Sequence, residues 1–271
     1  MSSYLKKQFI IGLVYLIVFS AIGSGIFFLF IYSPPSCTDG ILNQAEEDVD
    51  CGGPCQSCME ELFSPKVTWV KAFHVDDGLY DLAAYVENGN LNYGTGALPY
   101  VFKVYDESND LILEKRGKSY IMPREKKYIV EIVSFDKVPK KVELEFDEAE
   151  WRRFKKDGDS ATIEDLNLPV FNARLDLTQK DSYSARVDGT VYNQTKFDLA
   201  TIDINVAVYD LKGNPIAVNK TQKNTVRSQE GRFFEVVWPA LSISNDKDAR
   251  IDVQAYTNIF SDSNFIKNFF E

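Results

Sequence analysis

Residues 9–32 form an unbroken run of 24 residues without a charged side chain, FIIGLVYLIVFSAIGSGIFFLFIY. As a helix this run would extend about 36 Å, enough to cross a hydrocarbon core of roughly 30 Å. Lys6 and Lys7 precede it, and the next Lys or Arg after it is Lys66. Cytoplasmic loops carry an excess of lysine and arginine. The asymmetry therefore predicts a cytoplasmic segment 1–8, a single-pass transmembrane helix 9–32 in the lipid bilayer of the cell membrane, and an extracytoplasmic remainder.

A cleaved signal peptide is the alternative, because such peptides also combine lysines with an apolar segment. Their apolar region is usually only about 7–15 residues long. Cleavage near residues 21–23 would leave the apolar stretch 26–30 exposed at the new N-terminus. The length of the run therefore favours an uncleaved anchor.

All four cysteines, Cys37, Cys51, Cys55 and Cys58, lie in the segment 33–64, which we expect to form a cysteine-rich stalk module. This segment is too short for a hydrophobic core of its own, and an exported segment meets an oxidising environment. Both properties favour two disulfides, although the spacing leaves all three pairings open. Zinc is the alternative, because Cys55 and Cys58 have the separation of metal ligands.

Oxygen-bearing side chains gather between the first two cysteines, in a loop that a disulfide could close. Ca²⁺ takes 6–8 oxygen ligands, so the loop is a candidate calcium site. Its candidate ligands are Asp39, Asn43, Glu46, Asp48 and Asp50. The pattern is not that of an EF-hand, and a solvated acidic loop is the alternative.

The whole segment 37–58 reads C-x-D-G-I-x-N-x-x-E-x-D-V-D-C-G-G-x-C-x-x-C. This pattern resembles a short cysteine-rich module of secreted and surface proteins. The resemblance implies a stalk or spacer at the cell surface and no catalytic role.

From residue 65 onward, β-branched and aromatic residues alternate or cluster in short runs that end at turn residues. Examples are residues 101–106 (VFKVYD) and 202–210 (IDINVAVYD), each followed by a turn sequence such as Leu211-Lys-Gly-Asn. Alternation with a period of two is typical of β-strands with one buried face. The pattern predicts an all-β fold.

Two stretches of this β region are copies of each other. Residues 86–88 precede Val104-Tyr105-Asp106 as residues 191–193 precede Val208-Tyr209-Asp210. Glu131 follows Tyr105 by 26 residues, and Glu235 follows Tyr209 by 26 residues, so we expect both pairs to be equivalent. A repeat of about 100 residues made of short strands predicts two tandem immunoglobulin-like β-sandwiches, at 65–147 and 168–271.

Residues 148–167 are expected to link the two sandwiches. Their first part, EAEWRRFKK at 148–156, has acids first and bases last, which suits a short helix. Trp151 and Phe154 are expected to pack on a neighbouring domain.

The second copy, with VDGTVYN at 187–193 and INVAVYDLKGNPI at 204–216, resembles the FxLYD-type sandwich domains of extracytoplasmic proteins. The likeness extends over residues 185–237 and, more weakly, over residues 83–131. It implies binding or spacer modules and supplies no catalytic residues.

Catalytic chemistry has little support in the sequence. The only histidine, His74, lies in a predicted strand, and no G-x-S-x-G, Walker A or G-x-G-x-x-G motif occurs. Asp and Glu outnumber Lys and Arg by 40 to 30, a net charge of −10 that opposes nucleic-acid binding. We therefore expect no cofactor apart from the candidate calcium, and no enzymatic activity.

The sequence thus predicts a non-catalytic cell-envelope protein that binds a protein or glycan partner, or acts as a spacer, outside the membrane. An accessory subunit of a membrane protein complex is the first alternative. An extracytoplasmic hydrolase is a more distant one.

Overall fold

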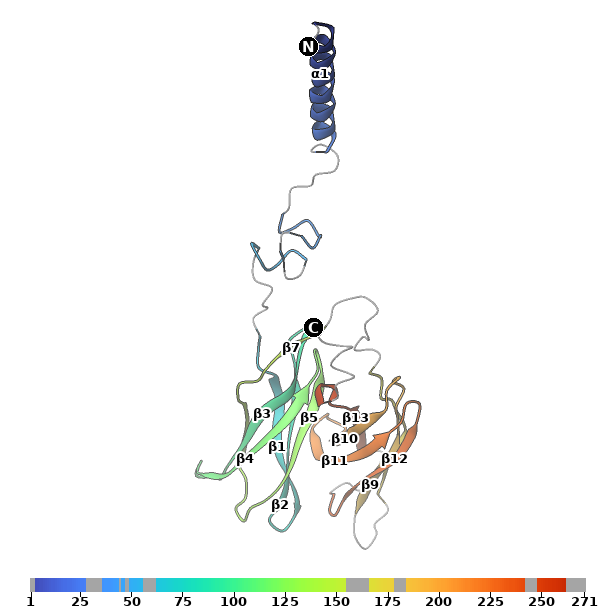
Figure 1. Cartoon of the computed structure of the whole chain (residues 1–271). Coiled ribbons are helices and arrows are strands. Elements are labelled where there is room, and N and C mark those ends of the chain that lie inside the picture. The colour runs from blue at the N-terminus through green and yellow to red at the C-terminus, as the bar shows by residue number, and fades with distance from the viewer. Residues whose placement is uncertain are drawn as a thin grey trace. The chain divides into compact units, whose positions relative to one another are not determined.

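The computed structural model describes residues 3–27, 36–43, 45–46, 49–55, 62–154, 166–177, 184–241 and 248–261. The chain divides into two compact units, Met1–Glu61 and Leu62–Glu271. The first contains a helix and the cysteine-rich segment, and the second is built from antiparallel β-sheets (Figure 1). The predicted all-β class with one N-terminal apolar helix is confirmed.

Helix α1 spans Ser3–Ile26. Its segment Lys6–Ile26 has a mean hydropathy of 2.3, and none of it is buried against other parts of the chain. A helix of this length and composition can cross a membrane, and a signal sequence can share both features. The last part of the predicted span, residues 28–32, lies outside the described residues.

The first half of the second unit forms two facing sheets, with the strand orders β1-β2-β5 and β4-β3-β6. These strands are β1 (Lys66–Asp76), β2 (Leu79–Glu87), β3 (Tyr93–Tyr105), β4 (Leu111–Ile121), β5 (Lys126–Ser134) and β6 (Lys141–Phe146). Between the sheets lies a core that includes Leu82, Phe102 and Val104. This sandwich is called the first sandwich below.

The second half repeats the arrangement with the orders β8-β9-β12 and β11-β10-β13. Its strands are β8 (Val170–Asp176), β9 (Ala185–Tyr192), β10 (Leu199–Asp210), β11 (Pro215–Val226), β12 (Gly231–Trp238) and β13 (Ala249–Tyr256), and the short 3-10 helix η4 (Ile259–Ser261) follows. Val208 lies in this core as Val104 lies in the first, which agrees with the alternation of their strands. This is the second sandwich.

The repeat extends to single hydrogen bonds at the strand ends. Asp106 accepts hydrogen bonds from the backbone N–H groups of Ser108 and Asp110, both at 3.0 Å. Asp210 accepts the same pair from Lys212 and Asn214, at 2.9 and 2.8 Å. Each aspartate therefore closes its hairpin in the way that aspartate favours in turns.

In both copies, a buried asparagine fixes the end of the strand that precedes the hairpin. The buried side chain of Asn88 donates to the carbonyls of Tyr93 and Met122, both at 2.8 Å. Asn193, with no exposed surface, makes the matching bonds to the carbonyls of Phe197 and Arg227. These contacts satisfy loop carbonyls that the sandwich would otherwise bury without a partner.

The expected equivalence of Glu131 and Glu235 is wrong by one residue. The backbone N–H of Asn88 donates to the carbonyl of Glu125, and that of Asn193 donates to the carbonyl of Glu230. Residue 125 is therefore equivalent to residue 230, and residue 131 to residue 236. A shift of one residue moves a strand side chain to the opposite face of its sheet. Accordingly, Glu131 accepts a hydrogen bond from the hydroxyl of Tyr100, whereas Glu235 faces outward and binds Arg186.

The helix expected at 148–156 is also wrong for the residues that the structure describes. Arg152–Arg153 form the short strand β7, which pairs with β3. Trp151 packs on the core of the first sandwich and Phe154 is buried in the core of the second. The edge of β3 supplies backbone hydrogen bonds and the two cores supply apolar contacts, and both outweigh a weak helical propensity.

The two sandwiches share no sheet among the described strands, but they pack face to face. The outer face of β1-β2-β5 lies against the outer face of β11-β10-β13, as Figure 1 shows. Their joint cluster of buried side chains is Phe73, Ala83, Tyr128, Val130, Ala207, Tyr209 and Val218. The sandwiches are therefore in direct contact through buried side chains, and not only through their connector. This contact is called the seam below.

Candidate functional site

The cysteine module contains a disulfide between Cys37 and Cys55. Cys51 is disulfide-bonded as well, and no cysteine is free among those that the structure describes. Cys58 lies outside the described residues. The disulfide prediction is confirmed for Cys37 and Cys55, and a zinc site that uses these two sulfurs as thiolates is ruled out in this oxidised state.

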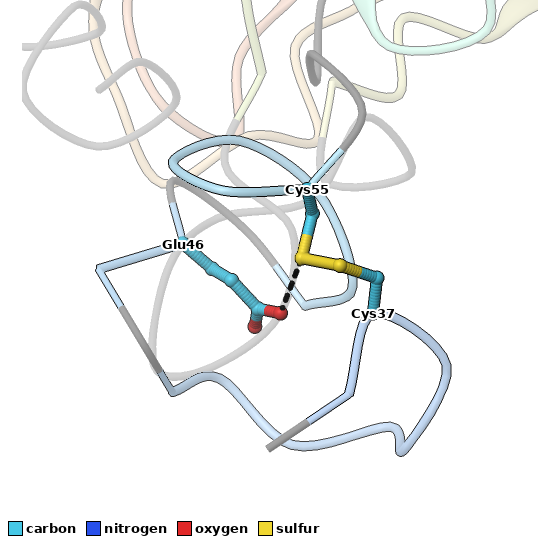
Figure 2. A group of neighbouring side chains, drawn as sticks. All are labelled: Cys37, Glu46 and Cys55. Carbon is cyan, nitrogen blue, oxygen red and sulfur yellow. Dashed lines mark hydrogen bonds between the residues drawn. A yellow bond between two sulfur atoms is a disulfide. The ribbon is translucent and has the colours of Figure 1, made fainter.

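Glu46 points at this disulfide, with Oε1 3.2 Å from Sγ of Cys55 (Figure 2). A disulfide sulfur carries no hydrogen, so the approach is a sulfur–oxygen contact and not a donated hydrogen bond. Cys37, Glu46 and Cys55 lie close enough together to surround an ion. Because the two sulfurs are bonded to each other, this trio offers a metal only one carboxylate.

The acidic side chains of the module accept hydrogen bonds from their own loop. Asp39 accepts from the backbone of Ser36 and Ile41 and from the side chain of Asn43, and these bonds hold the pKa of Asp39 below its usual value. Both Asp50 carboxylate oxygens accept from the N–H of Gly40, at 3.0 and 3.1 Å.

Glu46 Oε2 likewise accepts from the backbone of Asn43 and Asp50. Asn43 Oδ1 is buried without a hydrogen-bond partner in the described part of the module, and Asp48 lies outside that part. The carboxylates thus already organise the loop, and calcium binding stays a prediction.

Gly53 occupies a position of the module that requires glycine. Its φ is +54°, a left-handed conformation that side chains rarely adopt. A Cβ at this position would also lie 2.4 Å from the carbonyl oxygen of Ala45. Glycine is therefore required where the chain returns past its own loop.

The seam contains a group of interacting polar and aromatic side chains from both sandwiches. Trp69, Tyr85 and Tyr128 lie side by side on neighbouring strands, with ring centroids 6.2 Å apart for the first pair and 4.7 Å for the second. From the second sandwich, Tyr209 brings its hydroxyl to 2.8 Å from the hydroxyl of Tyr128. The hydroxyl of Tyr128 also donates to Asp252. Burial and this carboxylate raise the pKa of Tyr128.

Two further bonds cross the seam to the backbone of β5. The amide of Asn205 donates to the carbonyl of Tyr128 at 3.0 Å, and the ammonium of Lys220 donates to the carbonyl of Val130 at 2.5 Å. Buried polar groups fix a single arrangement when each has a partner. These bonds therefore join the two sandwiches through buried polar groups.

Lys127 is buried at one end of the seam. Its ammonium lies 3.5 Å from the ring centroid of Tyr120 and 4.5 Å from that of Tyr256, and 4.0 Å from the carboxylate of Glu125. Tyr256 belongs to the second sandwich, and Tyr120 of the first donates to Asp203 of the second at 2.7 Å. Burial lowers the pKa of Lys127, and the aromatic faces and nearby carboxylates favour its charged form.

A cavity of about 420 Å³ lies at the other side of the seam, between β1 and β11. Asp81 and Trp238 line it, and only 3% and 2% of their surfaces are exposed. Burial raises the pKa of Asp81 to about 6, against an opposing effect of Lys220. The indole N–H of Trp238 has no hydrogen-bond partner among the described residues. A cavity lined by such groups has room and polar partners for ordered water.

His74, the histidine that the sequence singled out, also lines this cavity. It is exposed on β1, where its ring contacts Tyr80. The seam residues Asp81 and Lys127 were not predicted from the sequence. Asp81 is the one charged residue of β2 before its last residue, Glu87, and this signal could have marked it. Lys127 follows Lys126 at the start of β5, where nothing in the local sequence distinguishes it.

No family model and no curated protein matches this chain. Among solved structures, the crystal structure of red sea bream transglutaminase is similar over 70% of this chain, with 9% sequence identity and a TM-score of 0.22. The chain spans 29% of the length of that transglutaminase chain. At this level of similarity, neither a fold nor an activity can be transferred.

Proposed function

We propose that this chain is a single-pass membrane protein of the cell envelope, with a cytoplasmic N-terminus and the cysteine module and both sandwiches outside. The observation that carries the proposal is the Cys37–Cys55 disulfide, which follows an apolar helix that is not buried by the described part of the chain. Disulfides persist in oxidising compartments, and an uncovered apolar helix is stable in a bilayer. Lys6 and Lys7 at the start of the helix support the orientation.

The sandwiches, in this proposal, act as a rigid and non-catalytic head that binds a partner or keeps a fixed spacing outside the membrane. The seam supports this role, because its tyrosines, Asn205 and Lys220 are engaged with one another across the two sandwiches. Rigid scaffolds of this kind present binding surfaces without the entropy cost of ordering flexible domains. The resemblance of the second copy to FxLYD-type domains agrees with a binding or spacer role.

An accessory subunit of a membrane protein complex is the second candidate. Phe171 and Phe233, which are 48% and 60% exposed on the outer sheet of the second sandwich, favour it. Exposed apolar groups of this size often mark protein contacts. Purification of the full chain in mild detergent separates the candidates: a stoichiometric complex supports the subunit, and an isolated chain supports an independent binding or spacer protein.

Reporter fusions test the topology. A reporter that is active only outside the membrane, fused after Glu271, is expected to be active. Protein isolated without reductant is expected to show no reactive thiol. Activity of a cytoplasm-only reporter at the same position would reject the orientation and the reason for expecting disulfides. Loss of the first 32 residues from the mature chain would identify a signal peptide instead.

A further inference from the structure

The seam is built on a row of three aromatic side chains in the first sandwich. Trp69 pairs with Tyr85 and Tyr85 with Tyr128, so the three lie side by side across β1, β2 and β5. The second sandwich covers this row with the centre of its β11-β10-β13 face, where Ala207 and Val218 are fully buried. Small apolar residues at that centre let the aromatic row approach the sheet closely.

The second sandwich carries the equivalent row on its own outer face. Asn88 corresponds to Asn193, and therefore Tyr85 corresponds to Thr190. Thr190 pairs with Phe171 on β8 and with Phe233 on β12. Phe171 and Phe233 thus occupy the positions of Trp69 and Tyr128, but they are exposed.

Two further features set this exposed row apart from its surroundings. Asn172, directly after Phe171, has a φ of 54° and lies in a bulge of β8. Bulges redirect side chains and occur often at functional positions. The charged side chains of the same face pair with each other: Arg186 lies 2.9 Å from Asp176 and 3.2 Å from Glu235. These charges flank the row, and Phe171, Thr190 and Phe233 themselves carry none, so the row can be covered without placing a charge at the centre of the contact.

We propose that the row Phe171–Thr190–Phe233 is a docking surface for the outer sheet face of an immunoglobulin-like sandwich in another protein. The partner face carries small apolar residues at its centre, as Ala207 and Val218 do within this chain. The established seam supports this occupant, because the same face of the same fold already binds such a sheet in the first sandwich. This inference rests on the proposed binding role and is independent of the membrane topology.

A second copy of this chain is excluded from this mode of docking by its own charges. The free face with the matching strand order is β4-β3-β6 of the first sandwich, and it is the sheet farthest from the second sandwich in Figure 1. At its centre, Lys103 stands at the position of Ala207 and Glu114 at that of Val218. Lys103 also forms an ion pair of 2.6 Å with Glu145. Docking there would remove these charges from water without new partners.

This difference provides a test with a defined probe. The variant Lys103→Ala, Glu114→Val, Glu145→Gln gives the β4-β3-β6 face three residues of the second sandwich, since position 145 corresponds to Gln254. A heterologous contact between identical chains generates larger assemblies. We expect the full-length variant in detergent, at about 0.1 mM protein, to at least double its mean mass relative to wild type in sedimentation measurements.

The contact is assigned to the exposed row by two further substitutions in the same background. Phe233→Lys is expected to return the mass to that of wild type. Leu211→Lys is the matched control, because Leu211 is 73% exposed in the β10–β11 turn, and it is expected to leave the assembly intact.

A triple variant that keeps the wild-type mass would overturn the proposal, as would assembly that persists with Phe233→Lys. Wild-type assembly that Phe233→Lys disrupts would identify a second copy as the occupant and also reject the proposal. If the triple variant loses its β-sheet circular dichroism, Lys103→Ala with Glu114→Val, which keeps Glu145, replaces it in the same comparison. These results leave the topology unaffected, whereas the reporter fusions leave the docking surface unaffected.

Discussion

The outer faces of β4-β3-β6 and β11-β10-β13 have the same strand order and opposite environments. Lys103 and Glu114 face water in the first sandwich, with 26% and 37% of their side chains exposed. The equivalent Ala207 and Val218 are fully buried in the seam. Two positions thus distinguish a solvated face from a docking face on one scaffold.

The comparison teaches that the fold and the contact are encoded separately. Turn residues and core residues are shared, as Asp106 and Asp210 or Val104 and Val208 illustrate. The outward positions of the same strands decide which sheets associate. Charge at the centre of a face keeps it in water, because association would remove that charge from solvent.

The largest expected effect comes from a charge in either core. Val104→Asp and Val208→Asp each bury an unpaired carboxylate, at a cost of about 4 kcal/mol or more. Because the sandwiches share the seam, Val208→Asp should also expose Trp69 and Tyr128. We expect faster hydrogen exchange in β2 as well as in β12, measured by mass spectrometry. Unchanged exchange in β2 would mean that the first sandwich is stable alone.

A charge exchanged between the two faces should have the next largest effect. Ala207→Lys places the residue of the first sandwich into the seam and is expected to lower the free energy of unfolding by about 3 kcal/mol. Its matched control, Lys103→Ala, removes an exposed ion pair and should cost less than about 1 kcal/mol. Urea unfolding followed by circular dichroism measures both. Equal costs would contradict the assignment of the two faces.

The sequence identified those features that depend on neighbouring residues. The hairpins at Asp106 and Asp210 and the alternation around Val104 and Val208 are local, and they predicted the strands and the two-copy architecture. The offset of 26 residues between Tyr105 and Glu131 does not mark equivalent positions, because the loops of the two copies differ by one residue. Such an offset is resolved only by pairing between strands.

The seam could not be predicted because its partners are far apart along the chain. Tyr128 and Tyr209 are 81 residues apart and Lys220 is 90 residues from Val130, so nothing in the local sequence links them. One signal was present in β2, which reads LYDLAAYVE and carries apolar or aromatic residues on both faces beside the charged Asp81. A strand of this kind is covered on both sides, and its partner had to be a second layer.

In the cysteine module, Asp39 accepts hydrogen bonds from backbone N–H groups of its own loop. Composition cannot distinguish this role from metal binding.

Asp81 makes the stability of the seam depend on pH. Its native pKa of about 6 lies above the ordinary 3.8, so the native state binds this proton more tightly than the unfolded state does. Ionisation of Asp81 therefore costs the native state free energy. This cost is fully present above pH 6 and shrinks as the pH falls towards 4. We expect Asp81→Asn to stabilise by about 1–2 kcal/mol at pH 7.5 and by almost nothing at pH 4. A gain independent of pH would show that the carboxylate does not titrate in the seam.

The smallest effect separates two equivalent tyrosines. Tyr209→Phe removes a buried hydroxyl whose oxygen lies 2.8 Å from that of Tyr128, and the loss of one such bond should cost about 1 kcal/mol. The hydroxyl of Tyr128 retains Asp252 as an acceptor, which limits the loss. Tyr105→Phe is the control, since Tyr105 lies on the solvated face and water can replace its hydroxyl contacts. Its expected cost is below about 0.5 kcal/mol. Paired urea titrations resolve this difference. A larger loss of unfolding free energy for Tyr105→Phe than for Tyr209→Phe would contradict the stabilising role of the hydroxyl bond in the seam.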